Sequence, residues 1–370
     1  MTPGSAPALT AEPLPQKGSV PDACPTLSTL ERMPKWLICV PLTLQWLWLA
    51  LRYRSLTLPS AANPGITSGG LVGEGKLEYF DQMGPVARRW TAVSCGVVAS
   101  EAVSHDHLSA MLGGHGVDFP LVAKPNLGLC GYGVRRVNDM AALLAYVHAF
   151  PRGETVVLQP YLPEEGEAGI FYARDPATGE GRVTDLALRY FPRVTGDGAS
   201  TLAQLMAKDT RTRRLSRTAR HEMVQDLNHV PALGEVHRLS TIGSTRVGGL
   251  YRDGAVHITP TLVRTVDAIA RDMGAFHFGR FDVRFDRFAD LQAGNMTIME
   301  VNGAGSEAIQ AWDPDVGVAQ GFRMIFAKQA LLFAIGHAQR ARGVRPMGVW
   351  ALARLNHRQN KLVQAYPPSN

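Results

Sequence analysis

The stretch Gly-Arg-Phe-Asp-Val-Arg-Phe-Asp occupies residues 279–286, and Met-Thr-Ile-Met-Glu-Val-Asn-Gly follows at residues 296–303. Apolar and charged residues alternate in the first stretch, and Met299 and Val301 alternate with Ile, Glu and Asn in the second. This period of two residues predicts two β-strands that each have one apolar and one polar face. Gly-Asn at 294–295 lies in the connection, so we expect an antiparallel hairpin.

The polar face of this hairpin would bring Asp282, Glu300 and Asn302 together. Two carboxylates and an amide oxygen suit Mg²⁺, with Mn²⁺ as an alternative ion, rather than zinc or copper. Arg280 points the same way as Asp282 and could face negative charge that develops on a reacting group. The alternative is an amphipathic hairpin whose polar face meets solvent.

Composition limits the classes of protein to consider. The 370 residues are 45% apolar and 19% charged, as in globular proteins with two or three subdomains. The net charge of +6 permits anionic partners such as nucleotides or an anionic membrane surface. No aromatic and basic platform or recognition motif indicates a nucleic-acid partner. Four cysteines without metal-type spacing favour a reduced, cytoplasmic compartment.

The N-terminal region divides into two segments. Residues 1–34 are rich in Pro, Ala, Ser and Thr without periodicity, which predicts a disordered tail. The apolar run at 36–51 is shorter than the roughly 20 residues that span a bilayer, and it begins too far along the chain for a signal peptide. Within residues 36–54, three tryptophans and flanking basic residues fit a helix lying on a membrane surface. The alternative is a helix packed on the protein itself or in a homodimer contact.

A glycine-rich loop follows the short apolar strand expected at 119–125. Its glycines, at 128, 131 and 133, permit close backbone approach and positive φ, so that amide N–H groups could cradle phosphate. The spacing alone fits a plain β-turn equally well. Lysine scarcity favours phosphate binding: the chain has 31 Arg and 7 Lys, and Lys76 and Lys124 are the only lysines between residues 36 and 207. Cys130 in the loop is a reactive thiol or a small filler residue.

With these residues the chain resembles the ATP-grasp superfamily of carboxylate-amine ligases, which includes D-alanine-D-alanine ligase, over roughly residues 73–340. The resemblance implies an α+β fold in which two α+β subdomains clasp ATP between antiparallel sheets, here with a shortened N-terminal region. It divides the chain into a disordered tail (1–34), an apolar helix and loop (35–75), an ATP-grasp domain (76–342) and a C-terminal tail (343–370).

The resemblance also implies a role for individual residues. The implied nucleotide contacts are Lys76, Lys124, the loop glycines Gly128, Gly131 and Gly133, the adenine-side residues Gln159, Tyr161 and Leu162, and the ribose-binding Glu167, with Glu165 as its alternative. The implied metal ligands are Asp282, Glu300 and Asn302. Arg280 is similar to the catalytic arginine, and Arg246 falls where relatives place a basic phosphate contact.

The implied activity is an ADP-forming ligase that uses ATP and Mg²⁺ to activate a carboxylate as an acyl phosphate and to join it to an amine. Its partners would be the small-molecule carboxylate and amine. An alternative from another class is an ATP-binding, membrane-associated scaffold without turnover; the complete set of expected ligands argues against it. Residues 303–314 differ from the turn that holds the acceptor in D-alanine-D-alanine ligase, so the acceptor stays open.

Further elements are expected from patterning. Strands at 155–162, 169–173 and 182–191 would continue the antiparallel sheet. Helices would begin after Asn138, after the N-cap Thr259, and at about residue 318. Residues 195–205 resemble an insert of cyanophycin-synthetase-like members, or are simply a turn and capped helix. The arginine-rich run at 208–220 is a solvated basic face or an acidic-substrate site.

Overall fold

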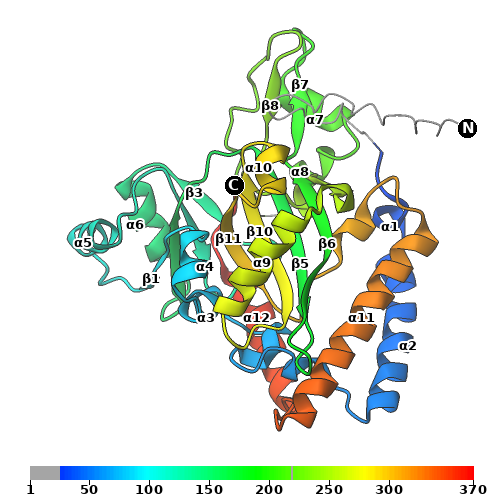
Figure 1. The fold of residues 1–370 in the computed structure, drawn as a ribbon. Coiled ribbons are helices and arrows are strands. Elements are labelled where there is room, and N and C mark those ends of the chain that lie inside the picture. The colour runs from blue at the N-terminus through cyan, green and yellow to red at the C-terminus, as the bar shows by residue number, and fades with distance from the viewer. Residues whose placement is uncertain (1–25, 218–219) are drawn as a thin grey trace, which may run out of the picture.

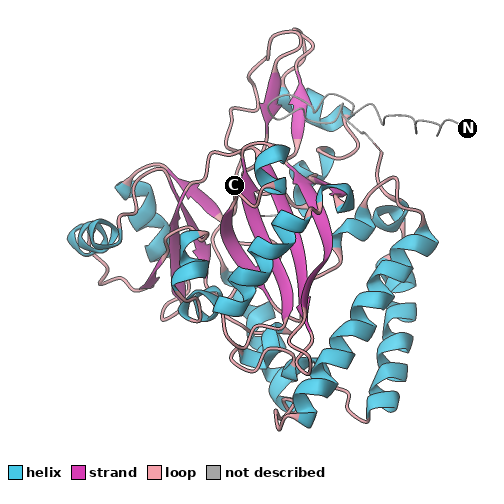
Figure 2. Ribbon diagram, in the orientation of Figure 1, coloured by secondary structure: helices cyan, strands magenta, loops and turns pink. Residues whose placement is uncertain are grey.

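Two antiparallel sheets organise the fold in the computed structural model, which describes residues 26–217 and 220–370 (Figures 1 and 2). The smaller sheet contains, in spatial order, β1 (Cys95–Val98), β4 (Thr155–Pro160), β2 (Leu121–Pro125) and β3 (Arg135–Val137). The larger contains β11 (Thr297–Asn302), β10 (Phe278–Phe285), β5 (Gly166–Arg174), β6 (Gly181–Tyr190) and β9 (Leu250–Asp253). The expected α+β class with antiparallel sheets is therefore confirmed.

Helices pack on both sheets. The smaller sheet carries α5 (His105–His115) and α6 (Met140–Ala149), and the larger sheet carries α3 (Lys76–Asp81), α4 (Pro85–Arg89) and α9 (Pro260–Asp272). The other helices are α1 (Thr29–Arg32), α2 (Lys35–Tyr53), α7 (Leu202–Lys208), α8 (Arg213–Arg217), α10 (Phe288–Gln292), α11 (Val318–Ala341) and α12 (Val349–Ala365). A small two-stranded sheet, β7 (Arg193–Thr195) with β8 (Val236–Arg238), projects at the top of Figure 1.

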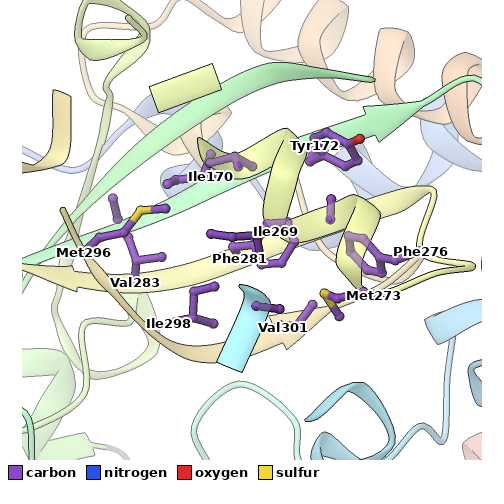
Figure 3. Packing of buried hydrophobic residues seen from close by; sticks show 14 of the residues in the cluster. Ile170, Tyr172, Ile269, Met273, Phe276, Phe281, Val283, Met296, Ile298 and Val301 are labelled. Carbon is purple, nitrogen blue, oxygen red and sulfur yellow. The ribbon is translucent and has the colours of Figure 1, made fainter. Parts of the chain in front are cut away.

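The main core lies between α9 and one face of the larger sheet. The apolar stripe of α9, which includes Val266 and Ile269, packs against Ile170, Phe281 and Val283, and all of these side chains are buried (Figure 3). Thr259 caps α9 and Pro260 opens it, as expected. Each such apolar side chain contributes roughly 1.5–3 kcal/mol when it is buried. This packing commits one face of the sheet to the core and leaves the opposite face for polar residues.

The decisive hairpin forms as predicted, with one correction. β10 and β11 pair antiparallel with Asp282 opposite Glu300, but the next pair is Val283 with Ile298, so Met299 is an extra residue in the ladder. This bulge turns Ile298, not Met299, toward the core, where Ile298 is buried. The expectation that Met299 belongs to the apolar face is therefore wrong, because strict alternation does not hold through a β-bulge.

Both ends of the described chain are more ordered than expected. Residues 1–25 of the expected tail lie outside the described residues, but α1 falls within 26–34, and Ser28 and Glu31 form a capping box on it. The expected C-terminal tail contains α12, and Tyr366 after it is buried in the core of the smaller sheet. With four residues, α1 is too short to show an apolar period in the sequence, and tertiary contacts hold it in place.

Three local expectations can be compared with the structure. The N-cap of α6 is Asp139 and not Asn138, because the Asp139 carboxylate accepts the backbone N–H of Ala142. Residues 195–205 form a turn and a helix capped by Thr201. The arginine-rich run is not simply solvated, since the chain around α8 pairs with Glu31 through Arg211 and Arg214.

Helices α2 and α11 pack against each other at the edge of the molecule (Figure 1). The Trp46 and Phe333 rings meet edge to face at 4.9 Å, and Gln45 donates to the Phe326 carbonyl at 2.9 Å. Among the described residues, α11 is the one helix long and apolar enough to cross a membrane by length and composition. It also contacts α2 and the end of the larger sheet, and 22% of its apolar window is buried within the molecule.

Asn63 connects the irregular segment before α3 to the start of β10. Its amide donates to the carbonyls of Gly69 and Phe278, both at 2.8 Å, and accepts the N–H groups of His277 and Phe278 at 2.8 and 3.0 Å. The side chain is fully buried, so all four bonds are shielded from water. Asn63 therefore fixes where β10 begins, two residues before Arg280.

We expect Asn63→Leu to lower the free energy of unfolding by about 3 kcal/mol or more, because it keeps the volume but leaves four buried backbone groups unpaired, each costing about 1–3 kcal/mol. Denaturant unfolding would measure the change. Asn228→Leu, at an exposed position, is the matched control and should change the value little. A loss below 1 kcal/mol for Asn63→Leu would show that these backbone groups find other partners.

Candidate active site

The face of the larger sheet opposite the core carries a row of charged side chains. Arg280, Asp282 and Arg284 alternate along β10, and the register places Glu167 of β5 opposite Arg284 and Arg189 of β6 opposite Glu167. Strand pairing thus gathers on one face charges that are far apart in the sequence.

Asp282 is the centre of this row and is only 1% exposed. It accepts from Arg280 Nε at 2.5 Å and Nη2 at 2.9 Å, from Arg189 Nη1 at 3.1 Å, and from Asn302 Nδ2 at 3.2 Å. Gly169, opposite Asp282 on β5, leaves room for Arg280, since a Cβ there would lie 2.8 Å from Arg280 Cδ. The two arginines therefore share one buried carboxylate.

The two expected nucleotide lysines reach the same hairpin from outside the sheet. Lys76 Nζ lies 3.3 Å from Glu300 Oε1. Lys124 Nζ donates to Gln159 Oε1 at 2.6 Å and to the Met299 carbonyl at 2.8 Å. Met299 is the bulged residue, so the bulge presents a carbonyl to a lysine of the smaller sheet. These contacts bring the end of β2 to β11.

Burial and charge shift the pKa values of these groups. Burial lowers the pKa of the Lys124 ammonium to about 8, although the attraction of Glu300 opposes the shift. Burial alone would raise the pKa of the Glu300 carboxyl, but Lys76 and Lys124 outweigh it and hold that pKa well below its usual range. Glu300 is therefore ionised at neutral pH, and Lys124 is a cation that can lose its proton under mildly alkaline conditions.

The glycine-rich loop lies beside Lys76 and Arg246. A Cβ at Gly128 would collide with Lys76 Nζ in its present position, so a larger residue there would displace the lysine from the backbone. Arg246 Nε donates to the Cys130 carbonyl at 3.0 Å, and its guanidinium lies 4.2 Å from the Tyr132 ring centroid. Gly131 and Gly133 have positive φ in this loop. Desolvation raises the pKa of the Cys130 thiol, which argues against a reactive thiol because reactive thiols have lowered values. Cys130 is exposed, so it does not act as a buried filler residue either.

The C-terminal segment holds the same loop, a contact that patterning did not predict. Gln359 of α12 donates to the Gly128 carbonyl at 2.9 Å, and Tyr366 Oη donates to the Leu127 carbonyl at 2.7 Å. Arg246 Nη2 also donates to Ser369 Oγ at 3.2 Å. Loop residues 127 and 128 are thus fixed by side chains from a segment expected to be a tail, which also contacts Arg246, the residue that bonds the carbonyls of residues 130 and 131.

The residues expected at the adenine and ribose lie on the connection between the sheets. Gln159 is buried near the end of β4, and Tyr161 and Leu162 follow it on the way to β5. Glu167 is buried and paired with Arg189 at 2.9 Å and with Arg284 at 3.2 Å. Glu165 is half-exposed and pairs with Arg193 and Arg238. The roles of these residues toward a nucleotide stay predictions.

The expected metal ligands satisfy a simple chemical test. Asp282 and Glu300 face each other across neighbouring strands, and the Asn302 amide contacts Asp282. Glu300 is ionised, and both carboxylates are paired with cations of the chain. Carboxylate and amide oxygens are ligands that suit a hard cation. The donor set therefore fits Mg²⁺.

Sequence reasoning missed three charged residues beside this set. Arg189 lies on a strand for which the sequence predicted no site residue, but its side chain links Glu167 to Asp282. Burial lowers the pKa of Lys328 on α11 to about 7, and Arg280 adds to that shift. Burial raises the pKa of Glu74, just before α3, to about 7. The rarity of lysine was the one sequence signal that could have pointed to Lys328.

No protein-family model matches the sequence, and no curated protein matches it. Among solved structures, the chain is similar to D-alanine–D-alanine ligase from Bacillus anthracis, with 17% identity, a TM-score of 0.40, and coverage of 75% of this chain and 70% of that one. The chain is also similar to D-cycloserine synthetase DcsG, with 16% identity, a TM-score of 0.37, and coverage of 73% of this chain and 70% of that one. A bifunctional glutathione synthetase from Pasteurella multocida is similar with 15% identity, a TM-score of 0.35, and coverage of 72% of this chain and 38% of that one.

All three solved structures are under 20% identical to the chain and superpose with TM-scores of 0.40 or below. The chain covers less than half of the length of the glutathione synthetase. Because the superpositions are partial, we base the function on the contacts of this chain's own residues.

We expect Asp282→Asn to lower the free energy of unfolding by about 3–5 kcal/mol without any ligand, because Arg280 would lose its buried countercharge and Arg189 would keep only Glu167. Denaturant unfolding would measure this change. Asp290→Asn, which removes the exposed pair with Arg287, should have a small effect. Equal effects of the two changes would show that the network around Asp282 is effectively solvated.

Proposed function

We propose that this protein is an ATP- and Mg²⁺-dependent ligase that activates a carboxylate as an acyl phosphate and joins it to an amine. The convergence of Lys76, Lys124, Asp282 and Glu300 on one hairpin carries this proposal. Two lysines suit the phosphates of a nucleotide, and two carboxylates suit the cation that accompanies them. Neither set alone would indicate more than a charged surface.

The first step would transfer the γ-phosphoryl group. A carboxylate oxygen of the substrate attacks the γ-phosphorus, and the bond to the β-phosphate oxygen breaks to release ADP. Lys76 and Lys124 would hold the phosphates, with the backbone of residues 128–133 over them. Asp282, Glu300 and Asn302 would hold Mg²⁺, which when bound neutralises phosphate charge. The protein itself contributes positioning and charge to this step.

The second step would join the amine to the activated carbonyl. The amine nitrogen attacks the carbonyl carbon, loses a proton, and phosphate leaves. Arg280 is suited to stabilise the oxyanion, because Asp282 fixes its Nε and Nη2 while Nη1 makes only a weak contact with the Glu307 carbonyl at 3.4 Å. A preorganised donor of this kind is worth about 3–4 kcal/mol. Lys328 nearby would add positive charge for an anionic substrate.

Incubation of the protein with ATP, Mg²⁺ and a metabolite extract would test the proposal, with mass spectrometry to find the pair that condenses. Glu300→Gln should abolish ADP formation, because it removes one metal ligand and the partner of Lys76. Glu101→Gln, at an exposed position, is the matched control and should retain activity. Nucleotide binding without turnover across the extract would favour the scaffold alternative. If the protein neither bound a nucleotide nor formed ADP, the proposal of a nucleotide site would be overturned.

Lys124 predicts a pH dependence for nucleotide binding. The ammonium has a pKa of about 8 in the free protein, and a bound polyphosphate favours its charged form. The affinity for Mg²⁺-ATP should therefore be highest below that pKa. It should fall by about tenfold between pH 7 and pH 9, because the protonated fraction of one group with this pKa falls about tenfold over that interval.

Titration calorimetry at a series of pH values would measure this dependence. Lys124→Arg keeps a positive charge over the whole range, so its affinity should stay constant over the same interval. Lys124→Met should bind weakly at every pH. A tenfold fall that persists in Lys124→Arg would assign the titration to another group.

A further inference from the structure

The outer face of α2 carries a stripe of exposed apolar side chains. They are Trp36, Leu37, Val40, Leu44, Leu47, Trp48 and Leu51, and we call them the α2 stripe. Leu51 is 80% exposed, Trp36 65% and Leu44 62%. At 100° per residue these positions fall within an arc of roughly 120°. The stripe runs along nearly the whole helix on one side.

The opposite face of α2 is already used within the molecule. Leu49 and Ala50 are buried against α11 and the turn that follows α2, and Trp46 donates its ring N–H to the Leu56 carbonyl at 3.0 Å. Packing on the protein therefore accounts for one side of the helix only. A continuous apolar patch on the other side marks an interaction surface.

Charge around the stripe identifies the partner. Arg32, Lys35, Arg52 and Arg54 are exposed near its two ends. No Asp or Glu occurs from residue 32 to residue 73. Exposed tryptophans also lie near both ends, where an interfacial helix places its amphipathic rings at the level of lipid headgroups. A flat apolar strip with cations at its ends is complementary to an anionic bilayer surface.

The same charges disfavour a second copy of this chain as the partner. Two α2 helices packed antiparallel through the stripe would bring Lys35 of one copy beside Arg52 and Arg54 of the other. If the two helices packed parallel, each cation would face the same residue of the other copy. Neither arrangement supplies a carboxylate from this segment, so like charges would meet at the rim and weaken the contact.

We propose that the α2 stripe binds the surface of an anionic lipid bilayer, with α2 lying in the plane of the interface and the rest of the protein above it. The helix does not cross the bilayer, because its inner face is held by α11. Binding combines burial of the apolar stripe with attraction of the four flanking cations, so it weakens as salt rises. This inference is independent of the ligase proposal.

Flotation of the full chain with vesicles would test the proposal. With phosphatidylcholine containing 30% phosphatidylserine, the wild-type protein should float at low salt, and phosphatidylcholine alone should bind it at least tenfold more weakly. Leu44→Glu with Trp48→Ala should reduce flotation at least tenfold by disrupting the stripe. Leu233→Glu with Trp350→Ala is the matched control, because those residues are 83% and 84% exposed elsewhere on the surface, and it should float like wild type.

A second variant, Arg52→Gln with Arg54→Gln, should lose binding to anionic vesicles while unfolding at the same temperature as wild type. Light scattering after gel filtration would follow the oligomeric state in parallel. Wild-type protein that stays at the bottom of the gradient at low salt would overturn the proposal. A dimer that Leu44→Glu dissociates, together with absence of flotation, would instead assign the stripe to self-association.

Discussion

Buried charges must be paired, and the arrangement around Asp282 follows from that constraint. One carboxylate that is almost fully buried satisfies Arg280 and Arg189, and Arg189 in turn engages Glu167. These partners come from β10, β6 and β5, so the network holds only while the strand register of the larger sheet is kept. The apolar packing of α9 on the other face fixes that register. The core thus determines where the charged groups of the candidate site lie.

The hairpin and the two lysines could be predicted from the sequence because their signals are local. Alternation over eight residues predicts a strand without knowledge of its neighbours, and a rare lysine is conspicuous in an arginine-rich chain. The bulge at Met299 could not be predicted, because it depends on how two strands pair. Arg189 also gave no local signal, since an arginine on a strand usually meets solvent and its partners are more than 20 residues away.

The C-terminal segment shows a further limit of patterning. The position of the helix at 349–365 depends on a few long-range contacts. Gln359 and Tyr366 bind backbone carbonyls of the loop at 127–128, and the Tyr366 ring stacks on Phe150 at 4.9 Å. A carbonyl of a glycine-rich loop has no sequence signature, so neither partner could be inferred. The order of this loop therefore depends on a region more than 220 residues further along the chain.

The pairing in the site also suggests how it could accept a nucleotide without large rearrangement. In the structure, Lys76 neutralises Glu300, and the two arginines neutralise Asp282. If Asp282 and Glu300 held a divalent cation, its charge would replace that of Lys76 at Glu300, and the lysine would be free to pair with phosphate. Such an exchange avoids leaving any buried charge uncompensated, which is the costly alternative. The pairing of charges within the chain is therefore compatible with a binding site.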